Sequence, residues 1–137
     1  MKHLIDTNVL SELRRRDPNR NVVRWVAERP ATTLYLSVLT LGELRKGVEG
    51  LPEGDRKRRL LDWLEVELPA YFAGRVLPVD ASVADRWGRL LAQAGRPVPA
   101  IDSLLAATAL VHGLTLVTRN RRDFQHPELT VLDPWTV

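Results

Sequence analysis

Four acidic residues, far apart in the chain, lie at positions where α/β proteins commonly bind ligands. Asp6 directly follows a short apolar segment, and Glu43 lies in the second turn of a helix predicted to begin at Val38. Asp102 opens a later predicted helix, and Asp123 lies in the loop after the most strongly apolar predicted strand. Because ligands of parallel sheets bind beyond the carboxyl ends of the strands, we expect these acids to converge.

Convergence of three or four carboxylates is unfavourable unless a cation offsets their mutual repulsion. The chain has no cysteine, so the available ligands are oxygens, and these favour Mg²⁺ or Mn²⁺ over zinc. Such an ion activates water and polarises a phosphoryl oxygen, which suits hydrolysis of a phosphodiester. Taken singly, each acid has a simpler explanation: Asp6 and Asp102 as helix caps, Asp123 as a turn residue and Glu43 as a surface side chain.

The basic residues indicate a polyanionic partner. Twenty Lys and Arg against seventeen Asp and Glu give a formal charge of +3. Most of the bunched positive charge is arginine, whose planar fork of donors matches phosphate. We expect Arg119 and Arg121, which flank the predicted acidic site, to contact the phosphate of a scissile nucleic-acid strand; the alternative is ordinary surface charge. The clusters are Arg14–Arg16, Arg56–Arg59, and Arg119 with Arg121 and Arg122.

Predicted strands alternate with predicted helices along the chain, which indicates an α/β domain with a mostly parallel sheet. The 137 residues fit a single domain over residues 1–137. Pro78 places the third strand at a sheet edge or at a strand end. The expected strands are residues 2–5, 34–36, 76–79, 114–117 and 129–132; the expected helices are residues 9–15, 21–29, 38 to about 51, 55–67, 81–94 and 101–112.

No apolar run approaches the roughly 20 residues that span a bilayer, so we expect no membrane contact. An acid at position 6 argues against a signal peptide, so the expected location is the cytoplasm.

Four blocks of sequence, in order along nearly the whole chain, resemble those of PIN-domain ribonucleases. The resemblance is greatest to the VapC-type toxins of bacterial toxin–antitoxin pairs, in particular the FitB-like group. The first block alone is weakly specific, whereas the four together are specific. The blocks are Leu4–Leu10, Ser37–Leu44, Ile101–Ala107 and Val117–Phe124.

This resemblance implies a three-layer α/β/α sandwich around a central parallel sheet, and Mg²⁺- or Mn²⁺-dependent cleavage of RNA. The four acids match the acidic quartet of the family. By that match, Asp6 and Asp102 are the primary metal ligands, and Glu43 binds the metal through water or orients the attacking water. Asp123 completes a second, weaker site.

The resemblance also assigns supporting residues. Thr7 and Thr118 match hydroxyl positions that hold an acid or a water at the metal. Asn120 is a departure, because many family members carry an acid at that position. A neutral amide there removes charge from the second metal site.

Partners follow from the same resemblance. Family members are neutralised by a small VapB-like antitoxin, often form homodimers, and join their antitoxin in larger assemblies that bind promoter DNA. This chain has no DNA-reading motif, so DNA contact is expected only through the antitoxin. Four apolar residues are candidates either for an antitoxin groove or dimer face, or for the core: Val22, Trp25, Trp63 and Leu64.

Two other functions remain open at the level of sequence. One is a small-molecule metal phosphatase, although the common aspartyl-phosphate type has a second acid two residues after the first, where this chain has Asn8. The other is a catalytically weak protein that keeps the PIN-like fold and only binds a partner.

Overall fold

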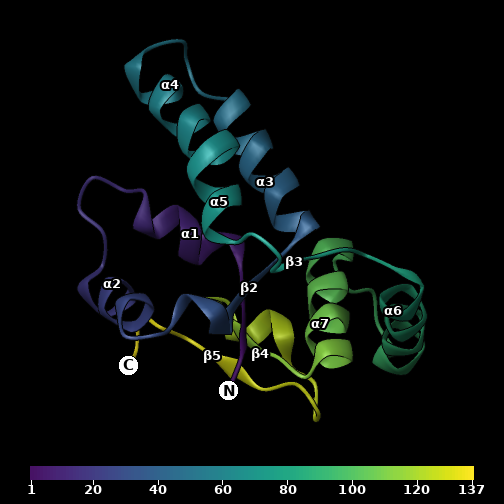
Figure 1. Ribbon diagram of the computed structural model, residues 1–137. Coiled ribbons are helices and arrows are strands. Elements are labelled where there is room, and N and C mark those ends of the chain that lie inside the picture. The colour runs from purple at the N-terminus through teal and green to yellow at the C-terminus, as the bar shows by residue number, and fades with distance from the viewer.

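Five short strands form a parallel sheet at the centre of the computed structural model, which describes residues 1–137 (Figure 1). All four strand pairings are parallel, and the strand order is β3-β2-β1-β4-β5. The edge position of β3, which ends one residue before Pro78, confirms the prediction from that proline. The strands are β1 His3–Ile5, β2 Leu34–Ser37, β3 Val76–Leu77, β4 Thr115–Val117 and β5 Val131–Leu132.

The strand order reverses at β1. The chain moves outward from β1 through β2 to β3, then returns to place β4 on the other side of β1, where Ile5 pairs with Val117. A reversal of this kind opens a crevice at the carboxyl ends of the two central strands. The residues that follow β1 and β4 therefore share one end of the sheet.

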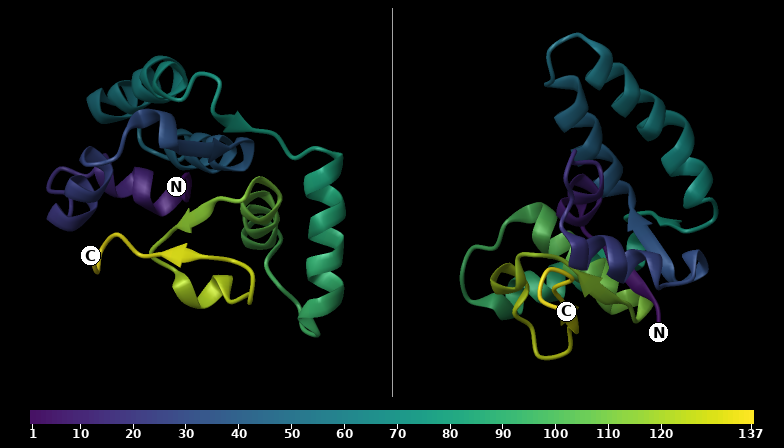
Figure 2. Two further views of the ribbon diagram at one scale, coloured as in Figure 1. Left: turned by 60° about the horizontal axis from the view of Figure 1, so that its bottom comes forward. Right: turned by 90° about the vertical axis from the view of Figure 1, so that its left-hand side faces the viewer.

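Helices cover both faces of the sheet (Figure 2), which confirms the predicted α/β/α sandwich. The alternation of side chains along β1 divides the core. Ile5 packs with α1 and α2, whereas Leu4 packs with α6 and α7 on the opposite face. These helices are α1 Thr7–Leu13, α2 Arg20–Ala27, α6 Ala81–Ala94 and α7 Ala100–His112.

Two helical arms project from this sandwich as a hairpin (Figures 1 and 2). The first arm is α3, Val38–Glu49; the second runs through α4, Asp55–Asp62, the π-helical segment η2, Trp63–Glu67, and α5, Leu68–Tyr71. The second arm is longer than the predicted helix over residues 55–67. Pro69 lies within it and has no N–H for the α-helical ladder, which accounts for the π-helical turn just before it.

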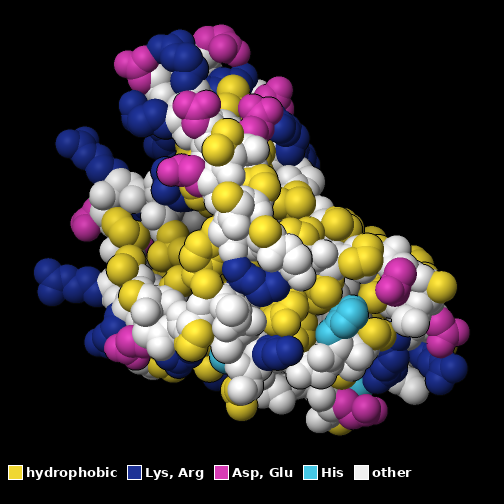
Figure 3. All heavy atoms as spheres, viewed as in Figure 1, with side chains coloured by type: hydrophobic (Ala, Val, Ile, Leu, Met, Phe, Trp, Pro, Cys, Tyr) yellow, Lys and Arg dark blue, Asp and Glu magenta, His cyan; other side chains and the backbone are white.

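The tip of the hairpin carries charges of both signs (Figure 3). Lys57 Nζ lies 2.9 Å from the Glu53 carboxylate, and Arg58 pairs with Asp55. The basic segment at residues 56–59 is therefore partly matched by acids of its own hairpin.

The four apolar residues considered for a partner-binding surface lie in the core. The structure buries all four of the residues considered for a groove or a core, so the core interpretation is confirmed for them. Trp63 alone also reaches the wall of a surface cavity of about 340 Å³ between α1 and α5. The exposed fractions are 0% for Val22, 3% for Trp25, 9% for Trp63 and 6% for Leu64.

Element ends follow local signals. Asp6 caps α1 directly, so this helix begins at Thr7 and not at the predicted Val9. Gly113 ends α7 with φ of 65°, a left-handed conformation that glycine adopts without strain. No helix combines the length and apolar character that crossing a membrane requires.

A buried histidine in β1 makes the stability of the fold depend on pH. His3 is 4% exposed, its Nδ1 has no partner, and its ring meets Trp25 edge-on at 4.9 Å. Burial lowers the pKa of His3, and the positive charges of Arg29 and of the N-terminus lower it further. The unfolded chain therefore binds the proton more readily than the folded chain.

We expect the free energy of unfolding to fall as the pH drops through about 6.5, the ordinary histidine range, by up to about 1.4 kcal/mol per pH unit. Urea unfolding at pH 7.5, 6.5 and 5.5 measures this. His3→Phe removes the titrating group, so its stability should fall less over this range. The control variant is His112→Phe, because His112 is exposed. If the free energy of unfolding depends on pH in the same way for His3→Phe as for His112→Phe, the prediction is wrong.

Candidate active site

The carboxylate of Asp6 is held in place where β1 ends. Its Oδ1 accepts the Thr7 N–H at 2.7 Å, and its Oδ2 accepts the Thr118 hydroxyl at 2.8 Å. The side chain is buried, with Asp6 only 7% exposed. Burial raises the pKa of Asp6, the two hydrogen bonds oppose that shift, and the charges of Glu43 and Asp102 add to it. The Asp6 carboxylate is thus fixed in orientation, but burial and the neighbouring negative charges make its ionised form unfavourable.

Thr118 is the centre of the hydrogen-bond network around Asp6. Besides donating to Asp6, its fully buried Oγ1 accepts the Asn8 amide at 3.2 Å and the Asn120 N–H at 3.1 Å. The network joins the segment after β1 to the segment after β4, 110 positions away in sequence for Asn8 and Thr118. Asn8 is a site residue that our sequence reasoning missed; its place as the third residue of Asp-Thr-Asn was the available signal.

Glu43 comes to the same end of the sheet from α3. That helix begins directly after β2 because the Ser37 hydroxyl caps it by accepting the Leu39 N–H at 3.0 Å. The Thr7 hydroxyl donates to Glu43 Oε1 at 2.6 Å. Thr7 therefore holds Asp6 through its backbone and Glu43 through its side chain, while the Glu43 side chain stays open to solvent.

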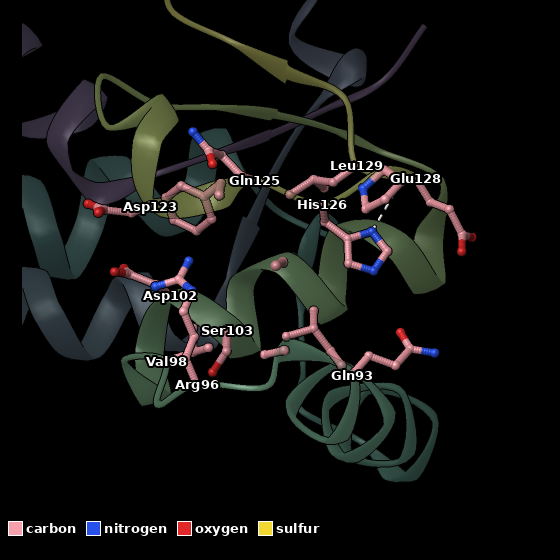
Figure 4. Close-up of a pocket in the computed structure, with 15 residues that line it drawn as sticks. Gln93, Arg96, Val98, Asp102, Ser103, Asp123, Gln125, His126, Glu128 and Leu129 are labelled. Atoms are coloured by element: carbon pink, nitrogen blue, oxygen red, sulfur yellow. Dashed lines mark hydrogen bonds between the residues drawn. The ribbon is translucent and has the colours of Figure 1, made fainter.

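The remaining two acids lie across the crevice. Asp102 is in the first turn of α7, and Asp123 is in the short 3-10 helix η3, Arg121–Phe124. Burial raises the pKa of Asp102, and the charges of Asp123 and Glu43 raise it further. In Figure 4 the carboxylates of Asp102 and Asp123 lie at the same end of a cavity. Charge interactions thus link Asp6, Glu43 and Asp102, whereas Asp123 interacts with Asp102.

The donor set fits a hard divalent cation that keeps part of its water shell. No three carboxylates or histidines are close enough to surround an ion by themselves. Mg²⁺ does not need such a cage, because it typically binds one or two carboxylates and completes its shell with water and substrate phosphate. Asp6 and Asp102 repel each other and are partly desolvated, so a cation between them would relieve both costs.

The other predicted residues sit around this group. Asn120 contributes its backbone: its N–H binds Thr118, and its carbonyl accepts the Asp123 N–H at 3.0 Å. The guanidinium of Arg119 lies 5.0 Å from the centre of the Trp135 ring. Arg121 is exposed on η3. Contact of Arg119 and Arg121 with phosphate stays a prediction.

The chain has a parallel sheet between two helical layers, with acidic residues where the strand order reverses. This arrangement is typical of metal-dependent α/β nuclease domains. The chain belongs to the PIN-domain family, whose sequence profile matches residues 3–128.

The chain is similar over almost its whole length to particular members of that family. It is 40% identical to the toxin FitB of Neisseria gonorrhoeae, covering 96% of this chain and 97% of that protein. It is 38% identical to the VapC ribonuclease Y4jK of Sinorhizobium fredii, covering 96% of each chain. A solved structure of FitAB bound to an IR36 DNA fragment matches with a TM-score of 0.89 and 37% identity, covering 96% of this chain and 94% of that one.

Proposed function

We propose that this protein is a Mg²⁺- or Mn²⁺-dependent endoribonuclease that acts in the cytoplasm as the toxin of a toxin–antitoxin pair. The observation that carries the proposal is the group of Asp6, Glu43 and Asp102, which come from three different elements at the reversal point of the sheet; the Thr7 hydroxyl bonds Glu43 beside Asp6, and the charge of Glu43 raises the pKa of both Asp6 and Asp102. Similarity to proteins named VapC ribonuclease and toxin FitB supports RNA as the substrate.

Asp6 and Asp102 would hold the metal, with Glu43 near it and Asp123 at a second, weaker position. When bound, such an ion supplies positive charge that polarises a phosphoryl oxygen and favours ionisation of water. The rigidity of the site comes from the chain itself, because Thr7 and Thr118 fix both oxygens of Asp6.

Glu43 is suited to orient the attacking water. The Thr7 hydroxyl holds its Oε1, and the solvent-open side chain leaves Oε2 able to accept a proton from water. The water oxygen forms a bond to phosphorus as the bond to O3′ breaks, and the departing O3′ takes up a proton from solvent. The products are a 3′-hydroxyl and a 5′-phosphate.

Removal of divalent ions tests the proposal. Purified protein, freed of any partner, should cleave structured RNAs with Mg²⁺ or Mn²⁺ and lose that activity in EDTA, because the clustered carboxylates alone repel the phosphate backbone. Gel analysis of end-labelled RNA measures both cutting and the 5′-phosphate end. Cleavage that persists in EDTA, or turnover of a phosphate monoester with none of RNA, contradicts the proposed function.

We propose further that a small antitoxin neutralises this chain, that DNA is contacted only through that partner, and that the chain forms homodimers. The similarity to FitB within the DNA-bound FitAB structure supports the first two proposals. Light scattering coupled to size exclusion measures the oligomer, and electrophoretic mobility with the chain alone and with its partner measures DNA binding. DNA binding by the chain alone contradicts this assignment.

A further inference from the structure

A cavity beside two of the acids has no part in the proposed chemistry. It measures about 380 Å³ and is lined by α6, α7 and the segment that follows β4, with Asp102 and Asp123 at one end (Figure 4). That volume is within the range of cavities that hold small organic groups, about 300–1,000 Å³. A group bound there would therefore be adjacent to whatever the acids act on.

Part of the cavity lining is apolar. Leu90 from α6, Ala106 from α7 and Phe124 from η3 line it, and all three belong to the core on that face of the sheet. The apolar part of the lining favours a largely uncharged, apolar group over a fully charged one.

Two planar side chains stand in the walls. His126 Nδ1 accepts the Glu128 N–H at 3.1 Å, so Nδ1 carries no proton and the ring proton is on Nε2. In Figure 4 the free edge of this ring faces across the cavity toward Gln93. Arg96 extends from the loop between α6 and α7 toward Asp102 in the same view. The cavity thus has an imidazole at one end and a guanidinium at the other.

We propose that this cavity is a nucleobase subsite, which receives the base of a single-stranded nucleotide next to the cleaved phosphate. The inference rests on the proposed ribonuclease function. Proteins that read single-stranded RNA stack unpaired bases on aromatic rings or arginine planes and bind the base edge with a few polar groups. Arg96 supplies a plane on which the base can stack, and His126 Nε2, on the ring edge that faces the cavity, supplies a donor for the base edge.

Abasic substrates test the subsite in the intact protein. A short RNA with one cleavage site is compared with two versions that lack the base on either side of the cut. We expect kcat/KM to fall about 5- to 100-fold for one abasic version, the range that loss of one stacked base gives. His126→Ala should lower kcat/KM similarly on the intact RNA and have no further effect on that abasic RNA.

The control is His112→Ala, which removes an exposed histidine at the end of α7, outside the cavity. It should cleave all three RNAs as the unmodified protein does. If both abasic RNAs are cut as fast as the intact one, or if His126→Ala loses as much on the abasic RNA as on the intact RNA, the subsite is overturned.

A binding measurement separates the subsite from the catalytic proposal. The four ribonucleosides, which carry no phosphate, are titrated into the protein in EDTA and followed by NMR. We expect shifts of the His126 ring and of backbone signals around Arg96 and Phe124 with at least one nucleoside. Shifts confined to other regions, or none, overturn the subsite. If no RNA is cleaved under any condition, the ribonuclease proposal fails and this titration alone decides the subsite.

Discussion

Replacing Asp6 by asparagine should reduce RNA cleavage by about 10³-fold or more without weakening the fold. The substitution removes the negative charge that would hold a divalent cation, and such cations supply several kcal/mol of transition-state stabilisation, each 1.36 kcal/mol being a factor of ten in rate. Single-turnover cleavage of end-labelled RNA with saturating Mn²⁺ measures the loss.

The stability of the same variant distinguishes a functional carboxylate from a structural one. Because burial and the charges of Glu43 and Asp102 raise the pKa of Asp6, its ionised form costs free energy in the folded state at neutral pH. Asp6→Asn should therefore unfold in EDTA at the same temperature as the unmodified protein or at a higher one. If Asp6 acted only as a helix cap, Asp6→Asn would instead lower the stability and leave cleavage normal.

The matched control is Asp85→Asn. Asp85 lies on the exposed side of α6, where its Oδ2 is 3.1 Å from Arg89 Nε. Exposed pairs of this kind contribute little, so both stability and cleavage should stay close to those of the unmodified protein. Equal losses of cleavage in Asp6→Asn and Asp85→Asn would place the catalytic site elsewhere.

Thr118→Val should lower cleavage about 10- to 100-fold, although Thr118 is fully buried. The isosteric valine removes the donor to Asp6 Oδ2 and the acceptor for Asn8 and for the Asn120 N–H. Loss of a group that orients a metal ligand typically costs this much in affinity or activity. Cleavage measured over a range of Mn²⁺ concentrations shows whether the loss lies in metal affinity.

Thr118→Ser provides the comparison. Serine keeps the hydroxyl and loses one buried methyl group, which costs about 1 kcal/mol of stability. Valine leaves buried polar groups without partners, which costs about 1–3 kcal/mol. Both variants should be less stable, but only Thr118→Val should lose cleavage; equal losses of activity in the two would show that Thr118 acts through packing alone.

The grouping of the acids at this site was predictable from the sequence. The alternation of apolar segments with helical periodicity is a local property, so it predicted the layered fold and the helix over residues 101–112, whose end agrees with that of α7. Pro78, another local signal, predicted the edge position of β3. Once parallel strands are expected, residues that follow them must meet at one end of the sheet. Asp6, Glu43 and Asp102 were therefore predictable as a group.

The partners of those acids were decided only in three dimensions. The bond from Thr118 to Asp6 joins residues 112 positions apart, and nothing local in either segment specifies which hydroxyl faces which carboxylate. The same holds for Trp25, which the sequence left open between surface and core, and for the cavity between His126 and Arg96. Local sequence determines which elements form and where they end, whereas burial and side-chain partners depend on how distant elements pack, and that packing is set by the whole chain at once.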